Sequence, residues 1–349
     1  MRSELAGNPH TPLAVSMGDP AGIGLEVALK AWAARVEEGL PPFVLFGDPI
    51  AAAQRARLLR LAVPIVPVEK LGGAVEIFKT ALPVRSVPLR THAGPGAPDR
   101  ANAAAIIGAI EAATAAVASG EATALVTNPI AKHVVAGPDF PYPGHTEFLA
   151  ALAARHWPGR RHHAVMMLAS PELRVVPLTV HIPFVEVPKA ITRDKLCQTV
   201  RITHAALKAD FGVRRPRIAV TGLNPHAGEE GTIGREEIDV IAPAVGDLCA
   251  EGLDVTGPHP ADTLFHAAAR ATYDAAVCMY HDQALIPFKS VAFEDGVNVT
   301  LGLPFVRTSP DHGTAFGIAA QGRASAQSFI ESLKLAATLA AARASAKAA

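Results

Sequence analysis

The chain has 349 residues, of which 50% are hydrophobic and 18% are charged, the profile of a well-packed enzyme. Its 32 basic side chains are balanced by 32 acidic ones, so no net positive field marks nucleic acid as the main partner. A chain of this length exceeds one typical core and favours two domains. We see no apolar run of about 18 residues and therefore expect no membrane span.

Residues 1–12 are polar and lack the apolar core of a secretion signal. The three cysteines show no CxxC spacing, so we expect reduced, buried thiols. Both features favour a cytoplasmic protein. The balanced charge and the missing apolar run favour one that binds neither nucleic acid nor membrane.

Strand-like apolar runs alternate with helix-like segments along the whole chain. The first half is predicted to contain the strand 13–17, a glycine-rich turn at 18–24, the helix 25–38, the strand 43–46, the helix 101–120 and the strand 124–127. The second half is predicted to contain strands at 164–168 and 175–180, the helix 189–209, a strand from 217, the helix 235–250, the strand 275–280 and the helix 325–348. The short turn 170–173 predicts an antiparallel hairpin. The alternation as a whole predicts an α/β protein with a largely parallel sheet.

Three histidines, His181, His226 and His281, each follow a short strand-like segment. The carboxyl ends of parallel strands line one crevice, where ligands bind. Three imidazoles there could hold a divalent metal with positions open for substrate, as a metal-assisted enzyme needs. A structural role for each histidine is the alternative, because the chain has 14 of them.

Two aspartates accompany these histidines. Asp282, beside His281, and Asp262 could orient a ligand or act as a base. Asp262 also fits the N-cap of a helix that begins before Leu264.

Further polar residues suit an anionic ligand. Thr146, next to His145, could cap a helix over 147–155 whose N-terminus favours an anion. Lys289, Asn298 and Arg307 form a polar series whose two cations suit a phosphorylated or carboxylated substrate. A polar loop and solvated surface charges are the alternatives.

The glycine-rich turn does not match a dinucleotide fingerprint, because its glycines lie at 18, 22 and 24 rather than in a GxGxxG spacing. By itself it predicts a tight strand-to-helix turn that could still border the crevice.

Six motifs, taken in order, resemble the 4-hydroxythreonine-4-phosphate dehydrogenase (PdxA) family from about Leu13 to the C-terminal helix. They are Met17–Gly24, Gly144–Glu147, Leu223–Glu229, Gly257–Thr263, Met279–Gln283 and Arg307–Ala315. The resemblance implies an isocitrate/isopropylmalate dehydrogenase-like fold, with two α/β/α domains around a cleft. It implies a cofactor-side domain of residues 1–135 plus 305–349, and a metal, substrate and dimerisation domain of residues 136–304. It also implies a homodimer with its active site at the interface.

The resemblance assigns a role to each candidate residue. The metal ligands, with one histidine supplied across the interface, are His181, His226 and His281, and the metal is Zn, Mg or Co. Substrate-binding positions are His145, Thr146, Lys289, Asn298 and Arg307. The loop 311–315 resembles an adenine-side cofactor loop, with NAD or NADP held by His312, Gly313 and Thr314. Candidates for proton transfer are Asp262, Asp282 and Lys289.

The implied reaction oxidises 4-phosphooxy-L-threonine to 2-amino-3-oxo-4-phosphooxybutanoate, which decarboxylates to 3-amino-2-oxopropyl phosphate in pyridoxal phosphate biosynthesis. The chain departs from the family pattern at Leu25, where proline is usual, and near Gly317, where relatives often carry an acidic residue, which leaves NAD and NADP both open. Alternatives are a dehydrogenase for D-threonate or D-erythronate 4-phosphate or another hydroxy acid, a metal-dependent hydrolase or aldolase, and a nucleotide-binding module.

Overall fold

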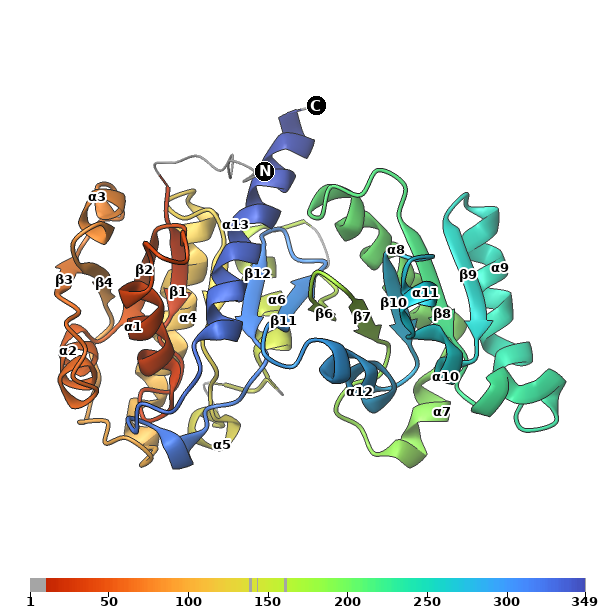
Figure 1. Ribbon diagram of the computed structural model, residues 1–349, viewed down its shortest axis with the longest axis horizontal. Helices are drawn as coiled ribbons and strands as arrows, with labels where there is room; N and C mark the ends of the chain where they lie inside the picture. The colour runs from red at the N-terminus through yellow and green to blue at the C-terminus, as the bar shows by residue number, and fades with distance from the viewer. Residues whose placement is uncertain (1–10, 138–139, 143, 160–161, 349) are drawn as a thin grey trace. The chain divides into compact units, whose positions relative to one another are not determined.

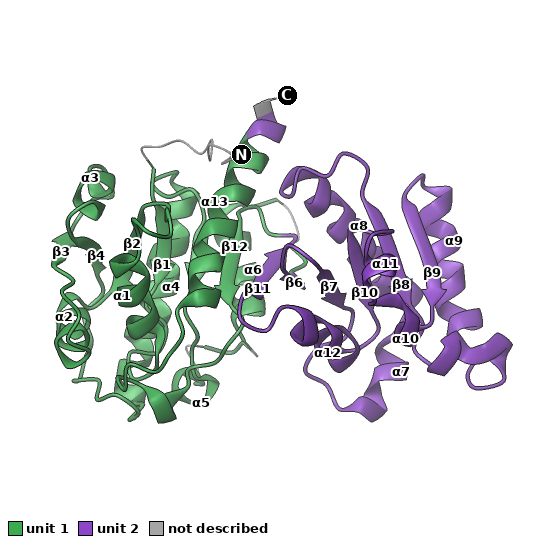
Figure 2. Cartoon of the chain, in the orientation of Figure 1, with its two compact units in different colours: residues 1–164, 303–344 green, residues 165–302, 345–349 purple. Residues whose placement is uncertain are grey.

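The computed structural model describes residues 11–137, 140–142, 144–159 and 162–348. The chain divides into two compact units (Figure 2), which are residues 1–164 with 303–344 and residues 165–302 with 345–349. The division differs from the expected one, since residues 136–164 fall in the first unit. The reason is that α6 (His145–His156) packs on α4 (Ala103–Ala118) of that unit.

Unit 1 is built on a parallel sheet with strand order β3-β4-β2-β1-β5-β12. Its strands are β1 (Leu13–Ser16), β2 (Phe43–Gly47), β3 (Ile65–Val68), β4 (Leu82–Ser86), β5 (Leu125–Thr127) and β12 (Arg307–Pro310). Its other helices are α1 (Gly24–Ala33), α2 (Pro49–Leu58), α3 (Ala74–Phe78), α5 (Lys132–Val135) and α13 (Gln327–Ala348), and short 3₁₀ turns lie at Arg100–Asn102 and Phe316–Ile318 (Figure 1).

Helices cover both faces of this sheet. The β1-α1-β2 and β4-α4-β5 connections run in opposite directions along the sheet, and right-handed crossovers then place α1 and α4 on opposite faces. Every residue of β1 and β2 is buried, as a sheet covered on both sides requires. The ring of Phe329 on α13 packs edge-on against Phe43 of β2, with centroids 6.2 Å apart.

Helix α4, with the turn before it, is 19 residues long and apolar enough in composition to cross a membrane. The sequence analysis saw no uninterrupted apolar run here, because Arg100, Asn102 and Glu111 lie within this stretch. Its apolar side chains Ile106, Ala109 and Ile110 are buried, and the helix contacts β1, β2 and β5. This is the pattern of a core helix in a two-sided sheet.

Unit 2 has a mixed sheet with strand order β11-β6-β7-β10-β8-β9. Its strands are β6 (Val165–Ala169), β7 (Arg174–Pro177), β8 (Arg217–Thr221), β9 (Asp254–His259), β10 (Ala275–Cys278) and β11 (Val297–Leu301). Its helices are α7 (Val187–Ala190), α8 (Arg193–Ala209), α9 (Ala242–Ala250), α10 (Ala261–Leu264), α11 (Ala267–Arg270) and α12 (His281–Val291), with a 3₁₀ turn at Phe184–Glu186 and a π-helical turn at Glu237–Ile241. Strands β7, β10, β8 and β9 are parallel, while β6 runs antiparallel to both β7 and β11. The predicted hairpin is confirmed as β6–β7.

Local chemistry explains where several predicted helices begin. The helix expected at 189–209 begins at Arg193, because the Thr192 hydroxyl caps it by accepting the Lys195 N–H at 3.3 Å. The helix expected at 235–250 becomes α-helical only from Ala242, where Pro243 occupies the first turn. The three cysteines are free thiols, as expected, but Cys249 is exposed rather than buried.

Candidate active site

Unit 2 brings two of the three predicted metal ligands side by side. His181 follows β7 and His281 follows β10, and these strands are parallel neighbours. Their imidazole centroids lie 5.5 Å apart. The two strand ends are tied together because the Thr179 hydroxyl donates to the Met279 carbonyl at 2.8 Å. Adjacent parallel strands therefore deliver both rings to one edge of the sheet, as the sequence predicted.

Gln283 fastens the start of α12, which carries His281. Its side-chain oxygen accepts from the Met279 N–H and the Thr221 hydroxyl, both at 2.7 Å. Its amide nitrogen donates to the Gly222 carbonyl at 2.8 Å. One side chain thus joins the ends of β8 and β10 to the helix. The sequence analysis quoted Gln283 within a motif but gave it no role. Its position two residues after a predicted metal ligand, His281, was the available signal.

Asp282 contacts His281 directly. One carboxylate oxygen lies 2.7 Å from Nδ1 of the imidazole. Such a bond fixes the tautomer and leaves Nε2 to face a ligand. Asp282 is otherwise exposed. Its geometry fits the orienting role that the sequence offered as one of two possibilities.

His226 lies apart on a loop of unusual backbone shape. Strand β8 ends at Thr221, so His226 does not close the strand but lies five residues beyond it. Residues 226–230 all have positive φ, between 44° and 79°. Only Gly228 among them adopts this region without strain.

Buried Glu237 holds this loop. One carboxylate oxygen accepts the N–H groups of Leu223 at 2.7 Å and Asn224 at 2.8 Å, and the other accepts from the Asn224 side chain at 2.9 Å. A side chain at Gly228 would come within 2.6 Å of the same carboxylate. The sequence analysis missed Glu237, because nothing in its local pattern separates it from a surface glutamate of a helix.

Within the described part of one chain, no group of three or more His, Cys, Asp or Glu side chains is arranged to hold a metal ion. Among the residues that the structure describes, the His181–His281 pair therefore has no third predicted metal ligand beside it. The resemblance expects one histidine from a second subunit, so the three-histidine metal site stays a prediction.

The other predicted residues of unit 2 lie on separate elements. Asp262 is exposed on α10, whose N-cap is Pro260, so the alternative of a capping aspartate is wrong. Lys289 lies in the last turn of α12 with its ammonium 5.2 Å from the Phe293 ring centroid. Asn298 is half-buried on β11. Lys289 shares a helix with His281, which the sequence did not anticipate.

In unit 1, the charge of Arg307 acts on the imidazole of His145. The Nε2 atom of His145 is buried and has no hydrogen-bond partner among the described residues. Burial, and then the positive charge of Arg307, lower the pKa of His145 to about 3. Arg307 is 4% exposed, and its Nε donates to the Thr127 hydroxyl at 3.2 Å. Burial lowers the pKa of Arg307 to about 10, so the group stays charged at neutral pH.

A buried cation beside a neutral imidazole can bind an anion, with the imidazole supplying a neutral hydrogen-bonding group. Thr146 lies in the first turn of α6, which begins at His145 with Gly144 as its N-cap and no capping side chain. The expected threonine cap is therefore wrong, because the helix begins at His145, two residues earlier than predicted.

The glycine-rich turn 18–24 packs directly on the loop 311–315. The Ile23 N–H donates to the Thr314 carbonyl at 3.0 Å. A side chain at Gly22 would come within 2.7 Å of the same oxygen. Around Gly313, in contrast, a side chain would meet no atom within 4 Å. His312 is half-buried, with Nδ1 lying 3.1 Å from the Gly313 carbonyl.

Unsatisfied polar atoms surround the glycine-rich turn. Within the described chain, Oγ of Ser16, Oδ2 of Asp19 and Oδ1 of Asn128 are buried without a hydrogen-bond partner. Burial raises the pKa of Asp19, although the Ala21 N–H donates to its other oxygen at 3.0 Å. These atoms lie where β1 and β5 end, which is the edge at which an α/β sheet binds ligands.

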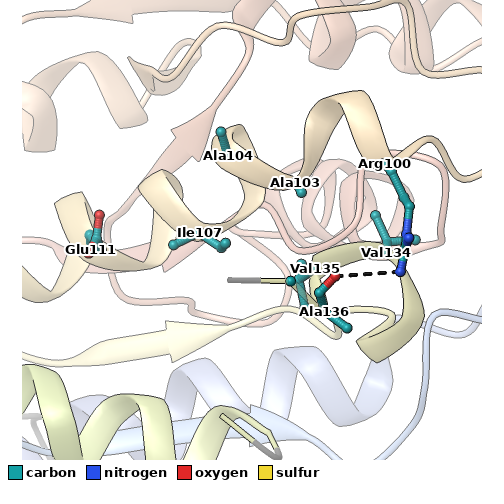
Figure 3. Close-up of a pocket in the computed structure, with 9 residues that line it drawn as sticks. Arg100, Ala103, Ala104, Ile107, Glu111, Val134, Val135 and Ala136 are labelled. Atoms are coloured by element: carbon teal, nitrogen blue, oxygen red, sulfur yellow. Dashed lines mark hydrogen bonds between the residues drawn. The ribbon is translucent and has the colours of Figure 1, made fainter. Parts of the chain in front are cut away.

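A cavity of about 420 Å³ lies elsewhere in unit 1 (Figure 3). It is lined by Arg100 of the 3₁₀ turn before α4, by one side of α4 from Ala103 to Glu111, and by the segment 134–137. Arg100 closes one end by donating to the His133 carbonyl at 3.0 Å and the Ala136 carbonyl at 3.4 Å. The lining residues that the structure describes include none of the predicted site residues.

The chain is similar in sequence to curated dehydrogenases over most of its length. It is 57% identical to the 4-hydroxythreonine-4-phosphate dehydrogenase of Methylorubrum populi, over 94% of each chain. It is 50% identical to that of Bradyrhizobium diazoefficiens, over 97% of this chain and 100% of the other.

Solved structures extend the likeness to the fold. A 4-hydroxythreonine-4-phosphate dehydrogenase from Klebsiella pneumoniae superposes with a TM-score of 0.83 at 35% identity, over 95% of this chain and 99% of that one. A terephthalate 1,2-cis-dihydrodiol dehydrogenase from Burkholderia xenovorans gives a TM-score of 0.61 at 27% identity, over 94% and 98%. The predicted α/β fold class is thereby confirmed. The family model described as pyridoxal phosphate biosynthetic protein PdxA matches residues 39–336, and the chain belongs to this family.

Proposed function

We propose that the protein is an NAD(P)-dependent, divalent-metal-dependent dehydrogenase that oxidises 4-phosphooxy-L-threonine to 2-amino-3-oxo-4-phosphooxybutanoate, which then loses carbon dioxide to give 3-amino-2-oxopropyl phosphate. The observation that carries the proposal is the His181–His281 pair, held at the ends of two neighbouring parallel strands in a member of the PdxA family. The names of the sequence relatives support the choice of substrate.

The paired imidazoles fit a Zn, Mg or Co ion as two of its ligands, with His226 as the proposed third. Nitrogen donors suit zinc and cobalt well. Asp282 keeps Nε2 of His281 available by holding Nδ1. When bound, the metal supplies Lewis acidity for the substrate hydroxyl, and the nicotinamide accepts the hydride.

The loop 311–315 fits the adenine side of NAD or NADP. The open space at Gly313 leaves backbone accessible to a ligand, while Thr314 is anchored to the glycine-rich turn. His312, Gly313 and Thr314 are the residues proposed to contact the dinucleotide. The unpartnered oxygens of Asp19 and Asn128 add hydrogen-bond acceptors at the same edge of the sheet.

Substrate binding is assigned to the charged and polar residues that the resemblance implies. Arg307 would hold a phosphate or carboxylate oxygen as a buried cation, and neutral His145 would hydrogen-bond to the same anion. Thr146 and Asn298 would add neutral hydrogen bonds. Lys289 is proposed to bind an anion or to transfer a proton. Because Asp282 orients His281, Asp262 and Lys289 are the better candidates for the proton-transfer step.

A homodimer is proposed from the surface of unit 2. Large apolar side chains are exposed there in one chain, including Phe184 at 68%, Val185 at 78%, Ile286 at 66% and Phe293 at 73%. The Phe184 ring lies 5.3 Å from that of Tyr280, next to His281. Exposed apolar groups of this size mark interaction surfaces. A second copy would cover them and bring its own histidine. With its metabolic substrate, we place the enzyme in the cytoplasm.

The test is a turnover assay on 4-phosphooxy-L-threonine with NAD or NADP, with and without Zn²⁺, Mg²⁺ or Co²⁺. We expect NAD(P)H formation that a chelator abolishes and that His281→Ala loses while the protein stays folded. D-threonate 4-phosphate, D-erythronate 4-phosphate and a cyclic dihydrodiol dicarboxylate are assayed in parallel, the last because of the terephthalate dihydrodiol dehydrogenase likeness. A higher kcat/KM on one of these compounds than on 4-phosphooxy-L-threonine would make that compound the assigned substrate. No dinucleotide reduction with any of them would instead favour a hydrolase or aldolase.

A further inference from the structure

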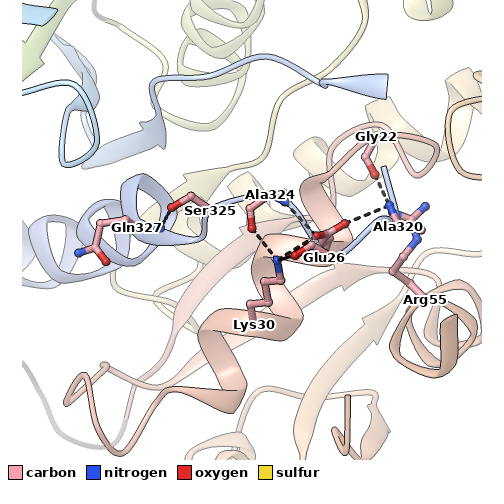
Figure 4. Close-up of polar contacts among 9 residues, drawn as sticks. Gly22, Glu26, Lys30, Arg55, Ala320, Ala324, Ser325 and Gln327 are labelled. Carbon is pink, nitrogen blue, oxygen red and sulfur yellow. Dashed lines mark hydrogen bonds and ion pairs between the residues drawn. The ribbon is translucent and has the colours of Figure 1, made fainter. Parts of the chain in front are cut away.

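An ion pair between a buried carboxylate, Glu26, and the partly exposed Lys30 contacts the segment 320–324 of unit 1 (Figure 4). Glu26, in the first turn of α1, has no exposed surface, and one of its carboxylate oxygens lies 2.9 Å from the Lys30 ammonium one turn later. A buried carboxylate is costly unless every oxygen is satisfied. The remaining partners of Glu26 therefore show what the pair does in the fold.

Those partners are backbone groups of the segment 320–324. Glu26 accepts the Ala320 N–H at 3.0 Å and the Ala324 N–H at 3.2 Å. Lys30 donates to the Gly322 carbonyl at 2.9 Å and the Ala324 carbonyl at 2.6 Å. Glu26 and Lys30 thus bind both N–H and C=O groups of a segment that lies almost 300 residues later in the sequence.

Arg55 of α2 holds the glycine-rich turn from the other direction. It is 3% exposed, and it donates to the carbonyls of Gly22 at 2.7 Å and Pro20 at 2.9 Å. Burial lowers the pKa of Arg55, and the nearby charge of Glu26 opposes that effect. Arg55 therefore stabilises the glycine-rich turn, and Glu26 and Lys30 link the following helix, α1, to the segment 320–324.

The segment from Asp311 to Ala324 contains two strained residues that these contacts stabilise. Ala315 and Ala320 both have positive φ, at 45° and 59°, which costs energy for a residue other than glycine. Such a backbone persists only where its surroundings impose it. The contacts that impose it are the Ile23–Thr314 hydrogen bond at one end and the hydrogen bonds from Ala320 and Ala324 to Glu26 at the other.

We propose that Glu26 and Lys30 are positioning residues that hold the loop 311–315 in the shape that binds the dinucleotide. The inference rests on the proposed function for the identity of the ligand. Neither side chain is assigned a contact with the cofactor; both act through the backbone of 320–324. Replacing Glu26 by glutamine keeps its size but turns one acceptor into an amide donor that faces backbone N–H groups or the ammonium of Lys30.

The experiment compares Glu26→Gln with the wild type and with a matched control, Glu38→Gln. Glu38 also forms an ion pair in unit 1, but its partner is Lys334 on α13, 2.8 Å away. Amide hydrogen exchange on the cofactor-free protein is expected to accelerate across 311–324 in Glu26→Gln alone. The Kd for NAD or NADP, measured by calorimetry, is expected to rise at least about tenfold, because hydrogen bonds to a charged group are lost. The KM for 4-phosphooxy-L-threonine and the kcat at saturating cofactor are expected to stay near wild type.

Unchanged exchange and unchanged Kd in Glu26→Gln would overturn the inference. Should that variant fail to fold, Lys30→Met decides in its place, since Lys30 is partly exposed and methionine preserves the helix and the aliphatic stem. A wild type that binds no dinucleotide removes the proposed function and the inference with it. A wild type that binds, with variants that bind equally well, removes the inference alone.

Discussion

The surroundings of His145 shift its pKa strongly. In the folded chain its pKa lies at about 3, against an ordinary value of 6.5, because of burial and the nearby charge of Arg307. Above pH 6.5 the ring is neutral in both the folded and the unfolded chain. As the pH falls below 6.5, only the unfolded chain takes up the proton, so His145 then favours unfolding.

We therefore predict that the wild type loses stability on acidification faster than His145→Gln does. Between pH 6.5 and about pH 4.5 the extra loss should be about 2 kcal/mol, since each pKa unit corresponds to about 1.4 kcal/mol. Urea unfolding at several pH values measures it. Parallel pH profiles for the two proteins would show that His145 is not shielded as the structure indicates.

Gln283 leads to a second prediction at the residue scale. Gln283→Leu keeps the bulk but removes the partners of the Met279 N–H, the Thr221 hydroxyl and the Gly222 carbonyl. Leaving such groups unsatisfied should lower the free energy of unfolding by about 1–3 kcal/mol. It should also weaken zinc binding about tenfold or more, because His281 loses its support. Gln198→Leu, on an exposed site of α8, is the control and should do neither. Equal stability for both variants would show that the hydrogen bonds of Gln283 do not hold the start of α12.

Among the elements, the loop after β8 depends most on one distant side chain. Five consecutive residues with positive φ, His226 among them, form a turn that short-range preferences oppose. Glu237 on the following helical segment offsets that cost with three hydrogen bonds to Leu223 and Asn224.

Glu237→Gln should lower the free energy of unfolding by about 1.5–3 kcal/mol, the contribution of hydrogen bonds to a charged group. Hydrogen exchange should accelerate at residues 222–231 before other parts of unit 2. The control is Glu229→Gln, an exposed position in the same loop, where we expect no change. If the two variants behave alike, the shape of the loop comes from its own sequence.

For the whole molecule, the decisive question is whether one chain completes the metal site. A single chain pairs His181 with His281 and leaves His226 on its separate loop. The exposed apolar surface of unit 2 supports a second copy. Light scattering should then give a mass near twice the 36.3 kDa of one chain.

Subunit exchange tests the shared site itself. Mixing inactive His281→Ala with inactive His226→Ala should restore activity, up to about half of the wild-type value per heterodimer, if one of these histidines crosses to the partner. The heterodimer then contains one intact and one doubly damaged site. Confirmed exchange without activity would place all the ligands of a site in one subunit.

The sequence by itself determined the α/β class, the β6–β7 hairpin and the candidate residues, because hydrophobic periodicity and ordered motifs are local properties of the chain. It placed His181 after β7 and His281 after β10, although these strands end at Pro177 and Cys278, a few residues before the histidines. It could not reveal that residues 136–164 belong to unit 1, since that depends on which helix α6 packs against.

Only the tertiary structure decided which side chains support the site. Glu26 reaches a segment nearly 300 residues later, Gln283 joins the ends of two strands, and Glu237 holds a left-handed loop. Each looks like an ordinary polar residue in its own stretch of sequence. Their roles come from burial against distant backbone N–H and C=O groups, which must be satisfied wherever water is excluded, and no local pattern encodes that pairing.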